Sequence, residues 1–243
     1  MIDLHSHILP ELDDGSQNLR QSLEMARLAL SGGITAMVAT PHCSGDRVRE
    51  VLEAVQLLRQ ALQEMDIPLK LYPGMEVFGT PDTARLLAEG RLLTLNDSRY
   101  PLIEFPFDTN GETETRILRD VLRAGFRPLV AHPERYGCIQ RNPALADRWI
   151  KMGCLFQVNR GSLLGRFGPG AQRMAVQLTE RGFASVVASD AHSHRVRTPW
   201  MEDIYSILSR ELSPMAARYL LEDNPRRILK NEDLPPVEPE WFE

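Results

Sequence analysis

Hydrophobic positions recur along this chain in two patterns that alternate. Short apolar runs predict buried strands, and longer segments with apolar residues three or four positions apart predict amphipathic helices. The strand pattern covers 2–7, 34–39, 69–72, 102–105, 128–131, 155–158 and 184–188, and the helix pattern covers 19–31, 48–65, 82–90, 112–124, 143–152, 170–181, 200–211 and 214–222. This alternation predicts an α/β fold with a parallel sheet of about seven strands, open or closed into a barrel.

The length and composition indicate one folded domain. A chain of 243 residues suits a single α/β unit, so we expect one domain over 1–243. Hydrophobic residues make up 43% of the chain, enough for a large buried core. The net charge of -5 argues against a nucleic-acid partner. Because no apolar run approaches about 18 residues, we expect no membrane-inserted segment.

The ends and the cysteines indicate a cytoplasmic location. The N-terminus lacks the charged and apolar regions of a signal peptide, and cleavage there would remove His5. Cys43, Cys138 and Cys154 are odd in number and widely spaced, which does not suggest a disulfide framework. We therefore expect a reducing compartment.

Histidine and acidic residues follow one predicted strand after another. His5 and His7 are two positions apart at the end of the first strand, so they would project to the same face. At the ends of later strands stand His42, Glu76, Glu104, His132, Asp190 and His192. Because a parallel barrel gathers the carboxyl ends of its strands on one face, we expect these side chains to converge.

Such a cluster of acids and bases is unstable unless metal cations compensate it. Each position alone has a simpler explanation, since a histidine can cap a loop and Glu104 can pair with an arginine. Their equivalent placement after successive strands favours a metal site. Nitrogen and oxygen ligands without cysteine favour Mn, Fe or Zn, and this many ligands suits two or three ions.

The set His5-Ser6-His7, His42, Glu76, His132 and Asp190-Ala191-His192 resembles the polymerase and histidinol phosphatase (PHP) family. The stretches 3–9, 13–15, 95–100, 132–136 and 224–228 are similar to the manganese-dependent protein-tyrosine phosphatases of bacterial capsule and exopolysaccharide operons. The similarity runs nearly end to end. It implies a distorted seven-stranded β/α barrel of PHP type with a trinuclear metal centre.

The resemblance also implies roles for individual residues. The first metal would be held by His5, His7, Glu76 and Asp190, the second by Glu76, Glu104 and His132, and the third by Asp14, His42 and His192. Glu104 stands where many other PHP proteins carry histidine, as it does in the tyrosine-phosphatase branch. Arg135 and Arg197 match the arginines that contact phosphate in that branch, although the Arg197 match rests on a looser loop.

The two arginines have a chemical argument of their own. Arg135 comes three residues after His132 and Arg197 five after His192, so both leave loops on the predicted metal face. A planar guanidinium can bind two oxygens of a phosphomonoester at once. The alternative is a solvated loop arginine, the fate of most of the 25 arginines here.

A cysteine nucleophile is the rival interpretation. Cys43 is separated from Arg49 by five residues, the spacing of cysteine-dependent tyrosine phosphatases. Cys154, however, also has an arginine six residues on, at Arg160, across an apolar strand, so this spacing arises by chance in an arginine-rich chain. The segment after Cys43 is not glycine-rich, since Gly45 is its one glycine, and Glu50 stands where Ser or Thr would follow the arginine.

We therefore expect a metal-dependent phosphomonoesterase that hydrolyses protein phosphotyrosine by attack of a metal-bridged hydroxide, with Mn as cofactor. The resemblance implies that its partner is the phosphorylated C-terminal tail of a capsule-assembly tyrosine kinase. Two alternatives are a small-molecule phosphatase, such as histidinol-phosphate phosphatase, and a non-catalytic metal-binding subunit.

Overall fold

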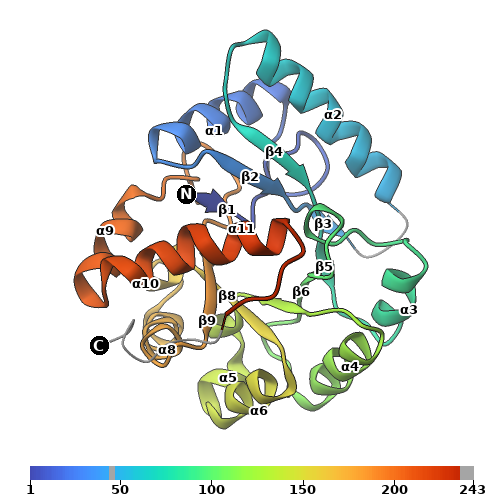
Figure 1. The fold of residues 1–243 in the computed structure, drawn as a ribbon, viewed down its shortest axis with the longest axis vertical. Helices are drawn as coiled ribbons and strands as arrows, with labels where there is room; N and C mark the ends of the chain where they lie inside the picture. The colour runs from blue at the N-terminus through green and yellow to red at the C-terminus, as the bar shows by residue number, and fades with distance from the viewer. Residues whose placement is uncertain (44–46, 236–243) are drawn as a thin grey trace.

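The computed structural model describes residues 1–43 and 47–235, and Figure 1 shows the strands with most of the helices arranged around them. The strands are β1 (Ile2–Asp3), β2 (Ala36–Ala39), β3 (His42–Cys43), β4 (Lys70–Pro73), β5 (Glu76–Phe78), β6 (Leu102–Glu104), β7 (Leu129–Ala131), β8 (Leu155–Asn159) and β9 (Ala184–Ala188). The helices are α1 (Leu19–Ser31), α2 (Val48–Glu64), α3 (Thr83–Ala88), α4 (Glu112–Arg123), α5 (Gly137–Arg141), α6 (Ala144–Met152), α7 (Arg160–Leu163), α8 (Pro169–Glu180), α9 (Glu202–Glu211), α10 (Pro214–Arg218) and α11 (Asn224–Leu229).

The strands form two parallel sheets, ordered β1-β2-β4 and β3-β5-β6-β7-β8-β9. The chain passes directly from β2 to β3 through Thr40 and Pro41, and from β4 to β5 through Gly74 and Met75. Pro41 has no N–H to donate to a neighbouring strand. A Cβ on Gly74 would lie 2.8 Å from Cγ1 of Val38, so the close approach here requires glycine. At each of these two strand breaks, the chain leaves a strand of the first sheet and enters a strand of the second.

The predicted α/β fold with parallel strands is confirmed, but the described residues form two sheets rather than one continuous seven-stranded sheet. The predicted first strand, 2–7, ends at Asp3. Beyond it, Ser6 makes an isolated parallel bridge to Ala191, and the amide of His7 donates to the Ala191 carbonyl oxygen at 2.8 Å. The chain after β1 therefore lies beside the chain after β9.

Both sheets contribute to one inner apolar core. The first sheet supplies Val38, the second supplies Leu102 and Val186, and α11 supplies Ile228. Asn224, also on α11, donates from Nδ2 to the carbonyl oxygen of Ser185 at the start of β9. Helix α11 thus covers the amino-terminal ends of the strands and leaves their carboxyl ends open.

The helix predictions are accurate where the apolar repeat is long. Helix α1 covers the predicted 19–31, and the side chain of Asn18 accepts a hydrogen bond from the amide of Gln21 at its start. The predicted helix 214–222 is divided in the structure. Its α-helical part, α10, ends at Arg218, and the π-helical turn Tyr219–Asp223 connects it to α11. That last helix and the short α5 and α7 were not predicted, because segments of four to six residues show no full apolar repeat.

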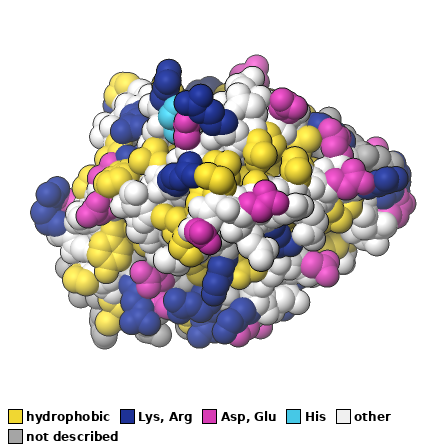
Figure 2. All heavy atoms as spheres, turned by 90° about the horizontal axis from the view of Figure 1, so that it is seen from above, with side chains coloured by type: hydrophobic (Ala, Val, Ile, Leu, Met, Phe, Trp, Pro, Cys, Tyr) yellow, Lys and Arg dark blue, Asp and Glu magenta, His cyan; other side chains and the backbone are white. Residues whose placement is uncertain are grey.

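The surface carries mixed charge. Figure 2 shows a face on which basic and acidic side chains lie interspersed with hydrophobic ones, unlike the one-signed surface of a nucleic-acid binder. Among the described residues, no helix combines the length and the apolar character that crossing a bilayer would require.

Two neighbouring leucines on α2 test the packing of the outer core. Leu58 is fully buried, whereas Leu57 is 52% exposed. We expect Leu58→Ala to lower the free energy of unfolding by about 2–5 kcal/mol, because it leaves a cavity between α2 and the sheet. Leu57→Ala, the matched control on the same helix, should change it by about 0.5 kcal/mol or less. Urea denaturation of both variants measures the difference, and equal losses would contradict this description of the core.

Candidate metal centre

The nine side chains predicted to bind metal come together at the carboxyl ends of the strands. Among the described residues, these nine are the His, Cys, Asp and Glu side chains that form groups of three or more with ligand atoms within 4.8 Å of one another. They are His5, His7, Asp14, His42, Glu76, Glu104, His132, Asp190 and His192. His42 and Glu76 reach this place because they begin β3 and β5, immediately after the two strand breaks.

Glu76 lies at the centre of the cluster and is 1% exposed. Its Oε2 lies 3.1 Å from Nε2 of His5, 3.3 Å from Nε2 of His7 and 3.1 Å from Nδ1 of His42. Its Oε1 lies 2.8 Å from Nε2 of His132. One carboxylate is thus shared by four imidazoles, the arrangement expected of a bridging ligand.

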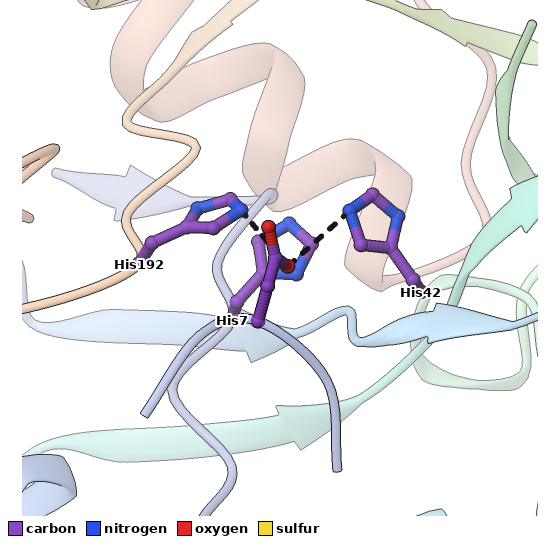
Figure 3. A group of neighbouring side chains, drawn as sticks. His7, His42 and His192 are labelled. Atoms are coloured by element: carbon purple, nitrogen blue, oxygen red, sulfur yellow. Dashed lines mark ion pairs between the residues drawn. The ribbon is translucent and has the colours of Figure 1, made fainter. Parts of the chain in front are cut away.

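The three ligand sets implied by the resemblance are partly reproduced. Asp14, His42 and His192 form one group together with His7, and His5, His7 and Asp190 form another. Figure 3 shows the rings of His42 and His192 on opposite sides of His7. The expected set of Glu76, Glu104 and His132 is divided in two, because His132 groups with His5 and Glu76 whereas Glu104 groups with His42 and Glu76.

Several nitrogen and oxygen atoms of the cluster lack hydrogen-bond partners within it and could bind cations instead. Buried atoms without a hydrogen-bond partner include Nδ1 of His42, Oε2 of Glu76 and Nε2 of His192. Nδ1 of His42 is only 2.8 Å from an oxygen of Glu104, yet the two lack hydrogen-bond geometry. Buried polar atoms are normally paired, so these lone pairs are available to an ion. The nitrogen and oxygen donors suit Mn, Fe or Zn.

The charges of the cluster are strongly coupled. Burial alone would lower the pKa of His5, but the carboxylates of Glu76 and Asp190 raise it to about 9. Burial and the neighbouring His7 lower the pKa of His192 to about 4. At neutral pH the metal-free protein therefore holds a proton on His5 and none on His192. Because an ion must displace that proton, metal affinity falls as the pH is lowered.

A shell of polar residues that the sequence analysis did not identify orients the ligands. Asp13 accepts a hydrogen bond from Nδ1 of His7 at 2.7 Å and from the amide of His42 at 2.9 Å. Gln157 Oε1 lies 2.8 Å from Nδ1 of His5, and Asn159 donates to Oδ2 of Asp190 at 2.6 Å. The signal was present, since Gln157 and Asn159 are polar residues two apart on the buried strand β8. Such partners fix the orientation of metal ligands.

The backbone is strained where the site residues leave their strands. His132, Asp190 and Arg197 have φ of 34°, 51° and 51°, in the left-handed region that side chains with a Cβ rarely adopt. Strain of this kind persists only where surrounding contacts enforce it, and it is concentrated at functional sites.

The two predicted phosphate-binding arginines lie beside the cluster. Nη1 of Arg135 is 3.7 Å from Oδ2 of Asp190, and Nη2 of Arg197 pairs with the same oxygen. The guanidinium of Arg135 lies between two rings, 4.2 Å from the centroid of Phe107 and 4.3 Å from that of Phe167. Both arginines are partly exposed, so an anion on the cluster could reach them.

The rival cysteine motif lies partly outside the described residues, since it includes 44–46. The similar pair of Cys154 and Arg160 is described. Burial raises the pKa of Cys154 to about 12, and Arg160 binds the carboxylate of Asp203 at 2.7 Å. A thiol in that state is not a nucleophile, which supports the view that the spacing alone carries little information.

The chain matches a family model along nearly its whole length. Residues 1–230 match the model described as capsular polysaccharide synthesis, CpsB/CapC. The chain belongs to the CpsB/CapC family. This agrees with the similarity to tyrosine phosphatases of capsule operons seen in the sequence.

Individual relatives of the CpsB/CapC chain match over almost their full length. The tyrosine-protein phosphatase YwqE of Bacillus subtilis is 36% identical, with 96% of this chain and 93% of the relative covered. The tyrosine-protein phosphatase CpsB of Streptococcus pneumoniae is 31% identical, with 96% and 99% covered. A solved structure from the work on YwqE and CpsB, described as unique metal-dependent tyrosine phosphatases, superimposes with a TM-score of 0.91 at 36% identity and covers 96% of each chain.

Asp13 tests the importance of the orienting shell in this CpsB/CapC protein. We expect Asp13→Ala to weaken Mn binding about 10- to 100-fold, since the variant leaves His7 without its acceptor. Asp82→Ala, which removes an exposed carboxylate near α3, serves as the control. Titration of the metal-free proteins with Mn measures both affinities. Unchanged affinity in Asp13→Ala would show that His7 is oriented without it.

Proposed function

We propose that this protein is a metal-dependent protein-tyrosine phosphatase, that is, a phosphomonoesterase that acts on phosphotyrosine in proteins. The proposal rests on one observation: nine side chains suited to bind metal lie next to two arginines on one open face. Relatives that match over nearly their full length and are named tyrosine-protein phosphatases support it. Nothing comparable favours a non-catalytic role, because a purely structural metal site has no need of two partly exposed arginines.

The ions would be held by side chains around Glu76, with His5, His7 and Asp190 in one group and Asp14, His42 and His192 in another. His132 and Glu104 would complete the coordination through Glu76. We infer Mn in two or three sites, with Fe or Zn as alternatives, from the nitrogen and oxygen donors. When bound, the ions would offset the charge of the phosphate and make water a stronger acid.

The protein side chains would orient the substrate. A phosphotyrosine brings two negative charges, and Arg135 and Arg197 would bind its phosphoryl oxygens in place of part of their present contact with Asp190. Both guanidinium groups would then stabilise charge that spreads over those oxygens in the transition state. The departing phenolate is weakly basic, which lessens the need for an acid among the protein side chains.

Several finer features belong to the same proposal. We infer that the two sheets act as one distorted seven-stranded barrel of PHP type, which the shared inner core and the bridge between Ser6 and Ala191 support. We infer a single domain over 1–243 and a cytoplasmic location. The substrate would be the tyrosine-phosphorylated tail of a capsule-assembly kinase. No nucleic acid would be a partner, and no segment would insert stably into a membrane.

One purified sample tests the activity. Exhaustive chelation, verified by elemental analysis, should abolish hydrolysis of a phosphotyrosine peptide, and Mn should restore it. Histidinol phosphate should be turned over far more slowly at the same enzyme concentration. Undiminished activity in the metal-free protein would refute the metal-dependent mechanism, and a preference for histidinol phosphate would favour the small-molecule alternative.

Arg135 tests the phosphate-binding arrangement. Arg135→Ala should keep the metals and lose about a hundred- to a thousandfold in kcat, because it removes one preorganised donor to the phosphoryl oxygens. Arg135→Lys should recover only part of this, since an ammonium cannot replace the planar fork. The matched control is Arg181→Ala, which removes an arginine 4.1 Å from the ring of Phe183. A raised KM with unchanged kcat would make Arg135 a binding residue without a role in the chemical step.

A further inference from the structure

An exposed aromatic ring stands at the edge of the candidate metal centre. Phe107, in the segment between β6 and α4, is 46% exposed. Its ring centroid is nevertheless 5.7 Å from that of the predicted metal ligand His132. Phe107 lies against this predicted metal ligand and against the predicted phosphate-binding Arg135. Its open surface therefore borders the space where a substrate would bind.

Phe107 is one half of an aromatic pair. The guanidinium of Arg135 is held between the rings of Phe107 and Phe167, and the guanidinium of Arg197 lies 5.6 Å from the centroid of Phe167. Both predicted phosphate-binding groups thus contact an aromatic ring. We call Phe107 and Phe167 together the aromatic rim.

The ring of Phe167 packs closely against Gly161. A Cβ added to Gly161, at the start of α7, would lie 2.6 Å from Cε2 of Phe167. Only a residue without a side chain therefore lets the ring pack this closely over α7. The segment that follows α7 places Phe167 next to both arginines.

We propose that the aromatic rim binds the aryl group of the substrate and makes the site select aryl phosphomonoesters over alkyl ones. This rests on the proposed phosphatase function and names the group that recognises its substrate class. A phosphate held by Arg135 lies next to both rings of the rim, so the aryl group attached to that phosphate is within reach of their open surfaces. Aromatic rings 4.5–7 Å apart attract one another in offset or edge-to-face arrangements, which an alkyl chain cannot match.

The selectivity is measured without turnover by comparing two phosphonates. Benzylphosphonate carries the aryl group, and methylphosphonate carries only the phosphoryl part. Calorimetric titration of the Mn-loaded protein gives the ratio of their affinities. In Phe107→Leu the preference for benzylphosphonate should fall by about two- to tenfold, the factor that an aromatic contact contributes. Phe107→Tyr should keep the preference, because it retains the ring.

Methylphosphonate separates the two roles that Phe107 can have. If Phe107 serves only to hold Arg135, both ligands should weaken equally and their ratio should stay constant in Phe107→Leu and in Phe167→Leu. That outcome overturns the inference. Phe183→Leu is the matched control, since it removes another ring stacked on an arginine and should leave both affinities unchanged.

Turnover distinguishes this inference from the function on which it rests. Wild-type protein loaded with Mn that hydrolyses no phosphotyrosine peptide would refute the proposed function, whatever the phosphonate ratio. Wild-type protein that hydrolyses the peptide, together with an unchanged ratio in the rim variants, would refute the aromatic rim alone. In the peptide assay, the expected result is a larger loss of kcat/KM for phosphotyrosine than for an alkyl phosphate in Phe107→Leu.

Discussion

The buried carboxylate of Glu76, shared by four imidazoles, is the interaction on which the rest of the site depends. A charge removed from water costs several kcal/mol unless partners replace its hydration. The charge of His5 and the hydrogen bond from His132 hold the pKa of Glu76 well below its usual range against the effect of burial, so the carboxylate stays ionised. In the metal-free protein the protonated His5 compensates this carboxylate, and metal ions would take over that role as they displace the proton. The cluster is therefore best understood as a site built for cations.

The backbone is organised to bring that carboxylate to its place. Strands β2 and β4 end at Ala39 and Pro73. After two intervening residues in each case, β3 begins at His42 and β5 at Glu76 in the second sheet. At Gly74 the chain packs closely against Val38, and Glu76 then pairs with Leu102 of β6 in the second sheet. The opposite end of the strands is closed by α11 and apolar side chains such as Ile228. The amino-terminal ends of the strands are thus covered by apolar packing, whereas the polar and strained segments lie at their carboxyl ends.

The sequence predicted what depends on local pattern and on residue type. The alternation of strands and helices, the span of α1 and β9, and eight members of the cluster followed from apolar periodicity and from histidine and acidic residues after strands. The ninth member, Asp14, was implied only by the resemblance to the PHP family. The strand breaks were not predicted, because Thr40-Pro41 and Gly74-Met75 resemble ordinary strand ends. Phe107 was missed because nothing in its local pattern separates an exposed loop phenylalanine at the site from one elsewhere. Asp13 could have been found, since it adjoins the predicted ligand Asp14.

Asp190 joins the metal cluster to the arginines. Its Oδ1 lies 3.5 Å from Nε2 of both His5 and His7, whereas its Oδ2 accepts from Asn159 and faces Arg135 and Arg197. Asp190 thus presents one oxygen to the imidazoles and the other to the arginines. A substrate phosphate would compete with Oδ2 for the arginines while Oδ1 remains directed at the imidazoles. Asp190 would therefore couple the proposed anion binding at the arginines to the proposed cation binding at the histidines, because one side chain faces both groups.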